Sequence, residues 1–156
     1  MELPRGEPDL SFLRQVPVLG GLGDAELSRL WLDIEVHRHG PGSRLVTEGE
    51  LGNEMFVLLQ GEVAVKSGGA TLRTLNTGDC FGEMSLIDIQ PRSASVEALT
   101  EVRVMVVGLD DLSRIFRADL ETYTLIALNI ARELSRRLRQ ANARLAALGE
   151  PRFGVP

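Results

Sequence analysis

Two short runs of the sequence hold the residues best suited to chemistry, FGEMSL at 81–86 and PRSASV at 91–96. Gly82 has no Cβ and lets the backbone approach a ligand, and the residues after it can form a helical turn whose unpaired N–H groups favour a phosphate. Arg92 lies nine positions beyond Glu83, so a fixed cation and a carboxylate acceptor can reach two sides of one small molecule. This pattern predicts a ligand with a phosphate and hydroxyl groups, although the two charged residues alone are also compatible with a plain ion pair.

The region that must position these runs is divided by many glycines. Between residues 34 and 108, short segments rich in Val, Leu and Thr alternate with glycine turns, a pattern typical of an antiparallel sandwich or barrel. The clearest strands are expected at 55–59, 62–66, 71–75, 93–98 and 102–107. Gly61 and the pair Gly68-Gly69 indicate two hairpins. The one helical interruption is the stretch around Gly82, and because a helix there costs strand pairing, we expect it to bind a ligand.

Helical patterns flank the strands. Residues 9–33 indicate a short helix, a glycine turn and a second short helix capped by Asp24, and after the strands one helix begins at Leu109 and a longer one runs from about Asp119 to Leu148. The predicted fold class is mainly β with flanking helices: an antiparallel β jelly-roll barrel with N-terminal helices, a short helix in the binding stretch and a long C-terminal helix. We expect a single domain over 1–156, with N-terminal helices at 9–33, the barrel at 34–108, C-terminal helices at 109–148 and a tail at 149–156.

The longer C-terminal helix carries a heptad pattern sustained for four heptads. Its members are Leu120, Thr124, Ala127, Ala131, Leu134, Leu138, Ala141, Leu145 and Leu148, which we call the seam. The seam can pack along the protein's own barrel or against a second copy, with Tyr123, Ile126 and Ile130 then facing the barrel. We favour a homodimer through residues 119–148, because no other element remains to cover the helix beyond Arg137.

Composition limits the possible classes of function. The net charge of −5 argues against a duplex-binding protein, although five of the sixteen arginines lie between residues 132 and 144 and leave a local basic face possible. The one cysteine, Cys80, excludes an internal disulfide and a Cys-based metal cluster. No stretch approaches the roughly 18 apolar residues of a spanning helix, so we expect no membrane association and a cytoplasmic location.

Together the two runs resemble the phosphate-binding cassette of cyclic nucleotide-binding domains, the family of catabolite activators and protein kinase A regulatory subunits. The cassette spans residues 81–96, and the likeness covers roughly residues 11–147, with Gly49, Gly52 and Gly61 at turns typical of the family. The resemblance implies that Arg92 pairs with the cyclic phosphate and that Glu83 accepts the ribose 2′-hydroxyl.

The same resemblance implies further contacts. Backbone amides near Gly82, Ser85 and Ser93-Ala94 would complete the phosphate cradle, with the Ser93 hydroxyl a further donor to the phosphate or the purine edge. The C-terminal helix, of the same subunit or of its dimer mate, would cover the purine. Aligning SRRL at 135–138 with similar bacterial stretches makes Arg137 and Asn142 the candidates for that purine contact, although both could equally lie on a solvated helix face with partners such as Glu133. The candidate ligand-binding residues are Phe81, Gly82, Glu83, Met84, Ser85, Arg92, Ser93, Ala94, Arg137 and Asn142.

Two other functions were compared with nucleotide binding. Catabolite activators add a helix-turn-helix module, which needs two further helices. Only eight residues follow Leu148, so we expect no direct DNA binding by this chain. The alternative is that the chain is the ligand-binding fragment of a longer transcription factor. A metal-dependent jelly-roll enzyme could use His37 and His39 on one face of a strand, but no properly spaced third ligand completes a site. We expect neither a metal nor a catalytic residue.

The sequence therefore predicts a sensor that binds a 3′,5′-cyclic nucleotide, cAMP in preference to cGMP, without hydrolysing it. No activated water or positioned base supports phosphodiesterase chemistry, and no cofactor besides the ligand is expected. If the nucleotide bridges the cassette and the C-terminal helix, it favours the docked position of that helix. The downstream partner is not identified by the sequence.

Overall fold

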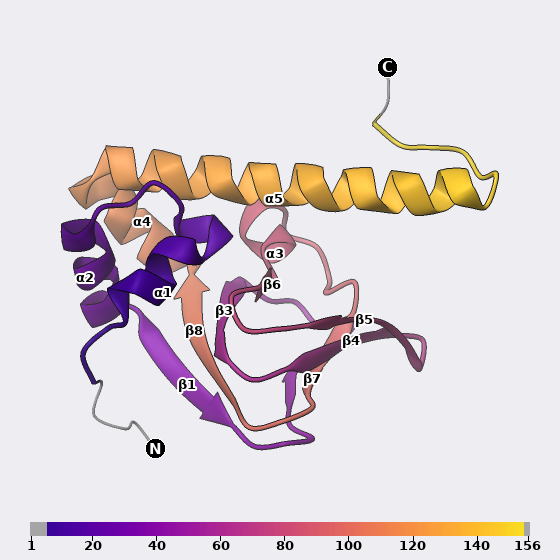
Figure 1. The fold of residues 1–156 in the computed structure, drawn as a ribbon, viewed down its shortest axis with the longest axis horizontal. Helices are drawn as coiled ribbons and strands as arrows, with labels where there is room; N and C mark the ends of the chain where they lie inside the picture. The colour runs from indigo at the N-terminus through magenta and orange to yellow at the C-terminus, as the bar shows by residue number, and fades with distance from the viewer. Residues whose placement is uncertain (1–5, 155–156) are drawn as a thin grey trace.

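Two four-stranded antiparallel sheets form the centre of the protein in the computed structural model, which describes residues 6–154 (Figure 1). One sheet has the strand order β1-β8-β3-β6 and the other β2-β7-β4-β5. The strands are β1 (Glu35–His39), β2 (Arg44–Val46), β3 (Glu54–Gln60), β4 (Val63–Ser67), β5 (Ala70–Leu75), β6 (Cys80–Phe81), β7 (Ser95–Ala98) and β8 (Val102–Gly108). The helices are α1 (Leu10–Gln15), the 3₁₀ turn η1 (Pro17–Leu19), α2 (Asp24–Asp33), α3 (Met84–Ile87), α4 (Leu109–Ala118) and α5 (Leu120–Ala147).

The predicted fold class is confirmed: the protein is mainly antiparallel β-sheet with flanking helices and a long C-terminal helix, although strand pairing does not close the two sheets. The central strands β3 and β8 explain this layering, because alternate side chains of a strand point to opposite faces. In β3, Phe56 and Leu58 are buried between the sheets, while Met55 and Val57 are buried against the helices. A strand covered on both faces is apolar throughout, as the run at 55–59 is.

The two predicted hairpins have different outcomes. β4 and β5 pair with Ser67 opposite Ala70, and Gly68 and Gly69 both have positive φ, so this hairpin is confirmed. The hairpin at Gly61 is wrong, because β3 pairs with β6 and β8 whereas β4 pairs with β5 and β7. Gly61 instead carries the chain from one sheet to the other. It has φ +96°, and a Cβ there would lie 2.4 Å from the carbonyl oxygen of Glu101.

Two predicted boundaries also need correction. Helix α2 is capped by Gly23, and Asp24 is its first helical residue, where its carboxylate still favours the positive end of the helix dipole. Strand β7 begins at Ser95 rather than at residue 93, so the start of the second cassette run stays in a loop. The helices predicted after residue 108 are confirmed as α4 and α5.

Helix α5 is fixed to the rest of the protein along its first half. Its N-cap Asp119 accepts hydrogen bonds from Thr122 N at 3.1 Å and Thr122 Oγ1 at 2.7 Å. One turn further on, Ile126 and Ile130 are buried in the core, as predicted. The buried Asn129 side chain donates from Nδ2 to two carbonyls of the N-terminal segment, those of Val18 at 3.2 Å and Gly20 at 2.8 Å. These contacts fix the position of α5, which Figure 1 shows lying along the helical side of the sheets.

Most of the seam is exposed in the single chain. Leu120, Leu138 and Leu148 are 58%, 41% and 75% exposed, and Leu134 packs only partly against the core. Tyr123 was expected to face the barrel but instead lies edge-on to Phe116 of α4, with ring centroids 5.1 Å apart. The homodimer therefore stays a prediction. Within residues 6–154, no helix has both the length and the apolar character that a membrane crossing requires.

Candidate functional site

The cassette begins where β6 ends and turns sharply at Gly82. Phe81 is buried and stacks on Phe56 of β3, with ring centroids 5.0 Å apart. Gly82 has φ +79°, and a Cβ at this position would meet the carbonyl oxygen of Glu54 at 2.9 Å. Any larger residue would be strained and crowded here. The turn leads directly into the one-turn helix α3, which confirms the predicted helical interruption.

Arg92 is held in place through its backbone. Its N–H donates to the carbonyl of Glu50 at 2.8 Å, and its own carbonyl accepts from the N–H of Gly49 at 2.9 Å. Leu51 and Pro91 form an isolated bridge beside these bonds. The glycine-containing turn at 49–52 therefore positions the second cassette run.

The Arg92 guanidinium reaches back to the first run. Nη1 donates to the carbonyls of Glu54 at 3.0 Å and Gly82 at 3.2 Å, and the group lies 6.0 Å from the centroid of the Phe56 ring. A Cβ on Gly52 would lie 2.4 Å from Nε, so only glycine leaves room for this position. Partial burial lowers the pKa of Arg92, while the carboxylates of Glu54 and Glu83 act in the opposite direction. The result is a cation fixed beside the Gly82 turn.

Glu83 does not pair with Arg92, so the simple ion pair between them is excluded in this structure. Glu83 is 2% exposed, and its Oε1 meets Nη1 of Arg137 from α5. Its Oε2 is buried and has no hydrogen-bond partner anywhere in residues 6–154. The buried acid therefore has one oxygen bound to the C-terminal helix and one oxygen without a donor.

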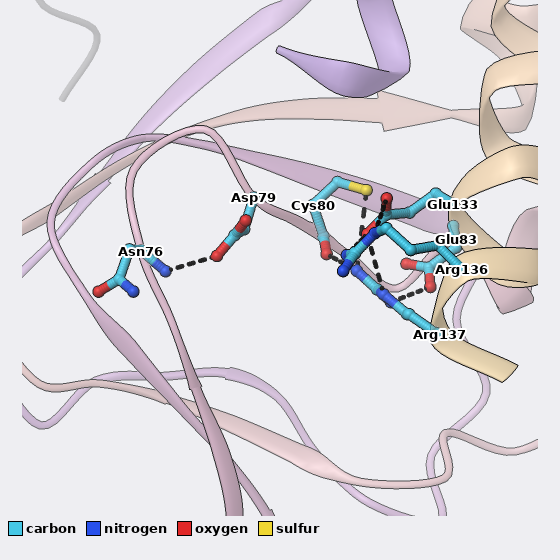
Figure 2. Close-up of polar contacts among 7 residues, drawn as sticks. All are labelled: Asn76, Asp79, Cys80, Glu83, Glu133, Arg136 and Arg137. Atoms are coloured by element: carbon cyan, nitrogen blue, oxygen red, sulfur yellow. Dashed lines mark hydrogen bonds and ion pairs between the residues drawn. The ribbon is translucent and has the colours of Figure 1, made fainter. Parts of the chain in front are cut away.

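Arg137 is the centre of a network that joins α5 to the cassette (Figure 2). Besides Glu83, it binds the carbonyl of Cys80 through Nη2 and donates from Nε to Oε1 of Glu133 at 3.2 Å. Arg136 donates from Nε to the other oxygen of Glu133 at 3.1 Å, and this bond is the main reason why the pKa of Glu133 is lowered. Burial raises the pKa of the Cys80 thiol to about 12, so the thiol is neutral at pH 7. The network holds two carboxylates against two guanidiniums.

The other predicted cassette residues lie in varied surroundings. Met84 is 60% exposed and Ser85 is 6% exposed, while Ser93 is exposed and Ala94 packs partly against the core between the sheets. The Ser85 N–H, a predicted phosphate donor, already donates to the carbonyl of Gly82 at 3.1 Å. In this structure the Ser85 N–H therefore closes the turn that begins at Gly82.

Asn142 is not brought to the cassette. Its side-chain amide exchanges two hydrogen bonds with the backbone of Phe153 in the C-terminal tail, including one from Phe153 N at 2.7 Å. Five residues along a helix rotate a side chain by about 140°, so Asn142 lies on a different face from Arg137. Of the two predicted purine contacts, the structure therefore places only Arg137 at the cassette.

Two residues of this site were not foreseen from the sequence, and the burial of a third is greater than expected. Gly52 was assigned to a turn, but its contact with the Arg92 guanidinium was not foreseen. Arg73 of β5 was not considered, and partial burial followed by the charge of Arg137 lowers its pKa. Glu133 was expected on a solvated face, yet it is 8% exposed. Its expected pairing with Arg137, at a spacing of four, is present.

The histidines of β1 do not form a metal centre. His37 Nε2 bonds to the Glu35 carboxylate at 2.8 Å, and the rings of His37 and His39 are 6.3 Å apart. Burial, followed by the nearby His37, lowers the pKa of His39. In the part of the chain that the structure describes, no group of three or more His, Cys, Asp or Glu side chains is arranged to hold a metal ion.

Comparison with protein families shows to which family the chain belongs. The model of the cyclic nucleotide-binding domain matches residues 36–119, which is more than half of the chain and includes the whole cassette. The chain belongs to the cyclic nucleotide-binding domain family. The predicted resemblance is thereby confirmed.

Individual relatives of this cyclic nucleotide-binding domain come from fungi and bacteria. The cAMP-dependent protein kinase regulatory subunit of Yarrowia lipolytica is 36% identical over 106 residues, a match that covers 67% of this chain but only 28% of that protein. The catabolite activator protein of Thermus thermophilus is 30% identical, with a TM-score of 0.74 over 85% of this chain and 63% of that one. A cyclic nucleotide-binding domain from Methylobacillus flagellatus KT is 24% identical, with a TM-score of 0.81 over 93% of this chain and 88% of that one. The last likeness concerns the fold alone.

Proposed function

We propose that this domain binds a 3′,5′-cyclic nucleotide and holds it unchanged as a regulatory module. The observation that carries the proposal is the Oε2 atom of Glu83, a buried acceptor without a donor among the described residues. Such an atom costs free energy until something donates to it. A ribose 2′-hydroxyl is a suitable donor, because it can reach Oε2 while Oε1 keeps its bond to Arg137.

The phosphate would lie against Arg92. Only Nη1 of this guanidinium makes hydrogen bonds within residues 6–154, so Nε and Nη2 keep N–H groups for a ligand. Guanidinium and phosphate match in geometry and charge, and one arginine balances the single negative charge of a cyclic phosphodiester. Gly52 and Gly82 keep the space beside the guanidinium free of side chains. The acid and the cation thus bind opposite ends of the same ribose phosphate.

Within this proposal we favour cAMP over cGMP. Support comes from the relatives, since the Yarrowia lipolytica protein is a cAMP-dependent kinase subunit and the Thermus thermophilus protein is a catabolite activator. The ligand would also strengthen the connection between the cassette and α5, because Glu83 would be bound by both at once. The output of the sensor would be the position of α5.

Two proposals concern what α5 contacts outside this domain. The exposed seam supports a homodimer through residues 119–148, and an isologous helix pair would bury Leu138 and its neighbours. Because the chain spans 28% of the Yarrowia lipolytica protein, a larger assembly or a longer transcription factor is equally part of this proposal. We propose no catalytic role for the domain itself.

Calorimetric titration of the chain with cAMP, cGMP and 5′-AMP tests the function. We expect one site per chain, tighter binding of cAMP than of cGMP, and much weaker binding of 5′-AMP, whose phosphate carries a second charge. In the variant Arg92→Ala the affinity for cAMP should fall by at least about 2 kcal/mol, or about thirtyfold, because the phosphate loses its partner. Equal affinity of Arg92→Ala and the unchanged protein for cAMP would refute the assignment, and tighter binding of cGMP would reverse the preference.

A further inference from the structure

The tail formed by residues 149–154 turns back over the distal end of α5 (Figure 1). The sequence encodes this reversal. Gly149 has φ +75°, and the N–H groups of Gly149 and Glu150 donate to carbonyls in the last turn of α5 at 3.1 Å and 2.8 Å. This bond pattern is typical of a helix that ends in a left-handed glycine, and Pro151 follows, which cannot continue the helix. The tail therefore leaves α5 in a defined direction.

Two side chains of α5 contact the returning tail. The N–H of Phe153 donates to Oδ1 of Asn142 at 2.7 Å, and Asn142 Nδ2 donates to the carbonyl of Phe153. These bonds leave Asn142 only 8% exposed. A Cβ on Gly154 would lie 2.9 Å from Cδ2 of Leu138, so the tail backbone lies directly against this leucine. Leu138 and Asn142 are four positions apart and share one face of the helix, which the tail covers.

The covered face overlaps the seam. Leu138 is a seam residue, and Asn142 directly follows Ala141, the next seam residue along the chain. In a pair of seam helices each side chain enters a hole formed by residues of the facing helix, with the two axes about 8–10 Å apart. A second helix at that distance would need the space beside Leu138 that Gly154 occupies. The folded tail and a paired helix therefore exclude each other.

The tail is held by a small contact. Two hydrogen bonds join it to Asn142, and each contributes only about 1 kcal/mol net. Phe153 is 66% exposed, so its ring adds little burial. Leu138 stays 41% exposed beneath the tail, which leaves much of its surface for a partner to cover. An interface that buries several seam leucines at once is favourable enough to displace such a contact.

We propose that the tail is an internal competitor of the homodimer: folded on α5, it takes the place of a second copy's helix at Leu138, and two copies pair only after both tails are released. This inference rests on the proposed dimer through the seam and adds a control of its strength. Because each release breaks two hydrogen bonds, the tail weakens dimerisation at least about tenfold.

Sedimentation equilibrium of the full chain tests the competition. Gly154→Val puts a branched side chain against Leu138 at a φ of +65°, so it should dislodge the tail without altering α5. The dissociation constant of the dimer should then fall at least about tenfold. Arg152→Gln, at an exposed position of the same tail, is the matched control and should dimerise like the unchanged protein. Gly154→Val combined with Leu138→Arg should be monomeric, because the tighter dimer still uses the seam.

Amide exchange of the Phe153 N–H follows the tail itself. It should be slow in the dilute unchanged protein, where Asn142 accepts this hydrogen, and should become fast as the protein concentration drives dimerisation. Equal or weaker dimerisation of Gly154→Val than of the unchanged protein overturns the competition and leaves the seam interface standing. Equal protection of the Phe153 N–H in monomer and dimer overturns the competition as well. Monomers of both proteins at high concentration overturn the seam interface, and the competition with it.

Discussion

Replacing Glu83 with glutamine tests the proposed division of work between the two carboxylate oxygens. In the structure Oε1 meets the Arg137 guanidinium and Oε2 has no donor within residues 6–154. Arg137 should orient the amide so that its carbonyl oxygen takes the place of Oε1. The NH₂ group then lies where a ribose hydroxyl needs an acceptor. Glu83→Gln therefore removes the acceptor for the ligand and keeps the shape of the side chain.

The expected effect follows from the strength of a hydrogen bond to a charged group, which contributes about 2 kcal/mol, or about thirtyfold in affinity. Glu83→Gln should weaken the binding of cAMP by that factor, and 2′-deoxy-cAMP should bind the unchanged protein more weakly than cAMP by a similar factor. The variant also removes the charge partner of the 14% exposed Arg137 side chain. Because Glu133 still accepts from Arg137, the cost in stability should stay near 2 kcal/mol, or about 5 °C in melting temperature.

Calorimetric titration of the unchanged protein and of Glu83→Gln, each with cAMP and with 2′-deoxy-cAMP, forms a double-mutant cycle. Loss of the 2′-hydroxyl should lower the affinity of the unchanged protein and have little further effect on the affinity of Glu83→Gln. Glu101→Gln, which alters an exposed ion pair with Arg38, is the control and should leave all affinities unchanged. If 2′-deoxy-cAMP loses as much affinity on Glu83→Gln as on the unchanged protein, Oε2 is not the hydroxyl acceptor.

Four further predictions concern the surroundings of the site. Gly52→Ala should displace the Arg92 guanidinium and weaken the binding of cAMP at least about tenfold. Gly40→Ala, with nothing within 4 Å of its new Cβ, should leave the affinity for cAMP unchanged, and equal affinities of the two variants by calorimetry would contradict the packing argument. Asn129→Ala should lower the free energy of unfolding by about 2 kcal/mol in a denaturant titration, because the buried carbonyl of Val18 and the partly buried carbonyl of Gly20 lose their donor. Saturating cAMP should slow amide exchange in residues 120–147, and unchanged exchange there would contradict coupling to α5. The chain should sediment as a dimer and Leu138→Arg as a monomer; a monomeric unchanged protein at high concentration would exclude the seam as an interface.

Local signals explain what could be predicted from the sequence. The pair Gly68-Gly69 indicates a tight turn by composition alone, and the β4–β5 hairpin forms there. The heptad spacing of α5 and the apolar run of β3 likewise depend on near neighbours in the chain. The glycine turn and short helix of the cassette could also be predicted from a local signal, because Gly82 permits a backbone conformation that other residues rarely adopt.

Contacts between distant parts of the chain explain what could not be predicted. Gly61 has the composition of a hairpin, and its true role depends on the carbonyl of Glu101 on a neighbouring turn. The partner of Glu83 lies 54 positions away in α5, and although the resemblance singles out Arg137 as a purine contact, no pattern in the sequence indicates that Arg137 pairs with Glu83. Asn142 stays a predicted purine contact, and in the described chain its side chain exchanges two hydrogen bonds with the backbone of Phe153, a residue eleven positions further on. Tertiary packing decides each of these contacts.

The arrangement of α5 indicates how a small ligand could have a large effect. Asn129 and the buried isoleucines fix the first half of the helix to the N-terminal segment, so this half has a defined position without ligand. Beyond Glu133, the connection between α5 and the cassette depends on the charged network around Arg137, and the seam residues there are largely exposed. A network of charges at the end of a fixed segment responds to small changes, because its members are satisfied only in one geometry. A hydroxyl that binds the second oxygen of Glu83 would therefore act on the least secured part of the helix, which is also the part that carries Leu138.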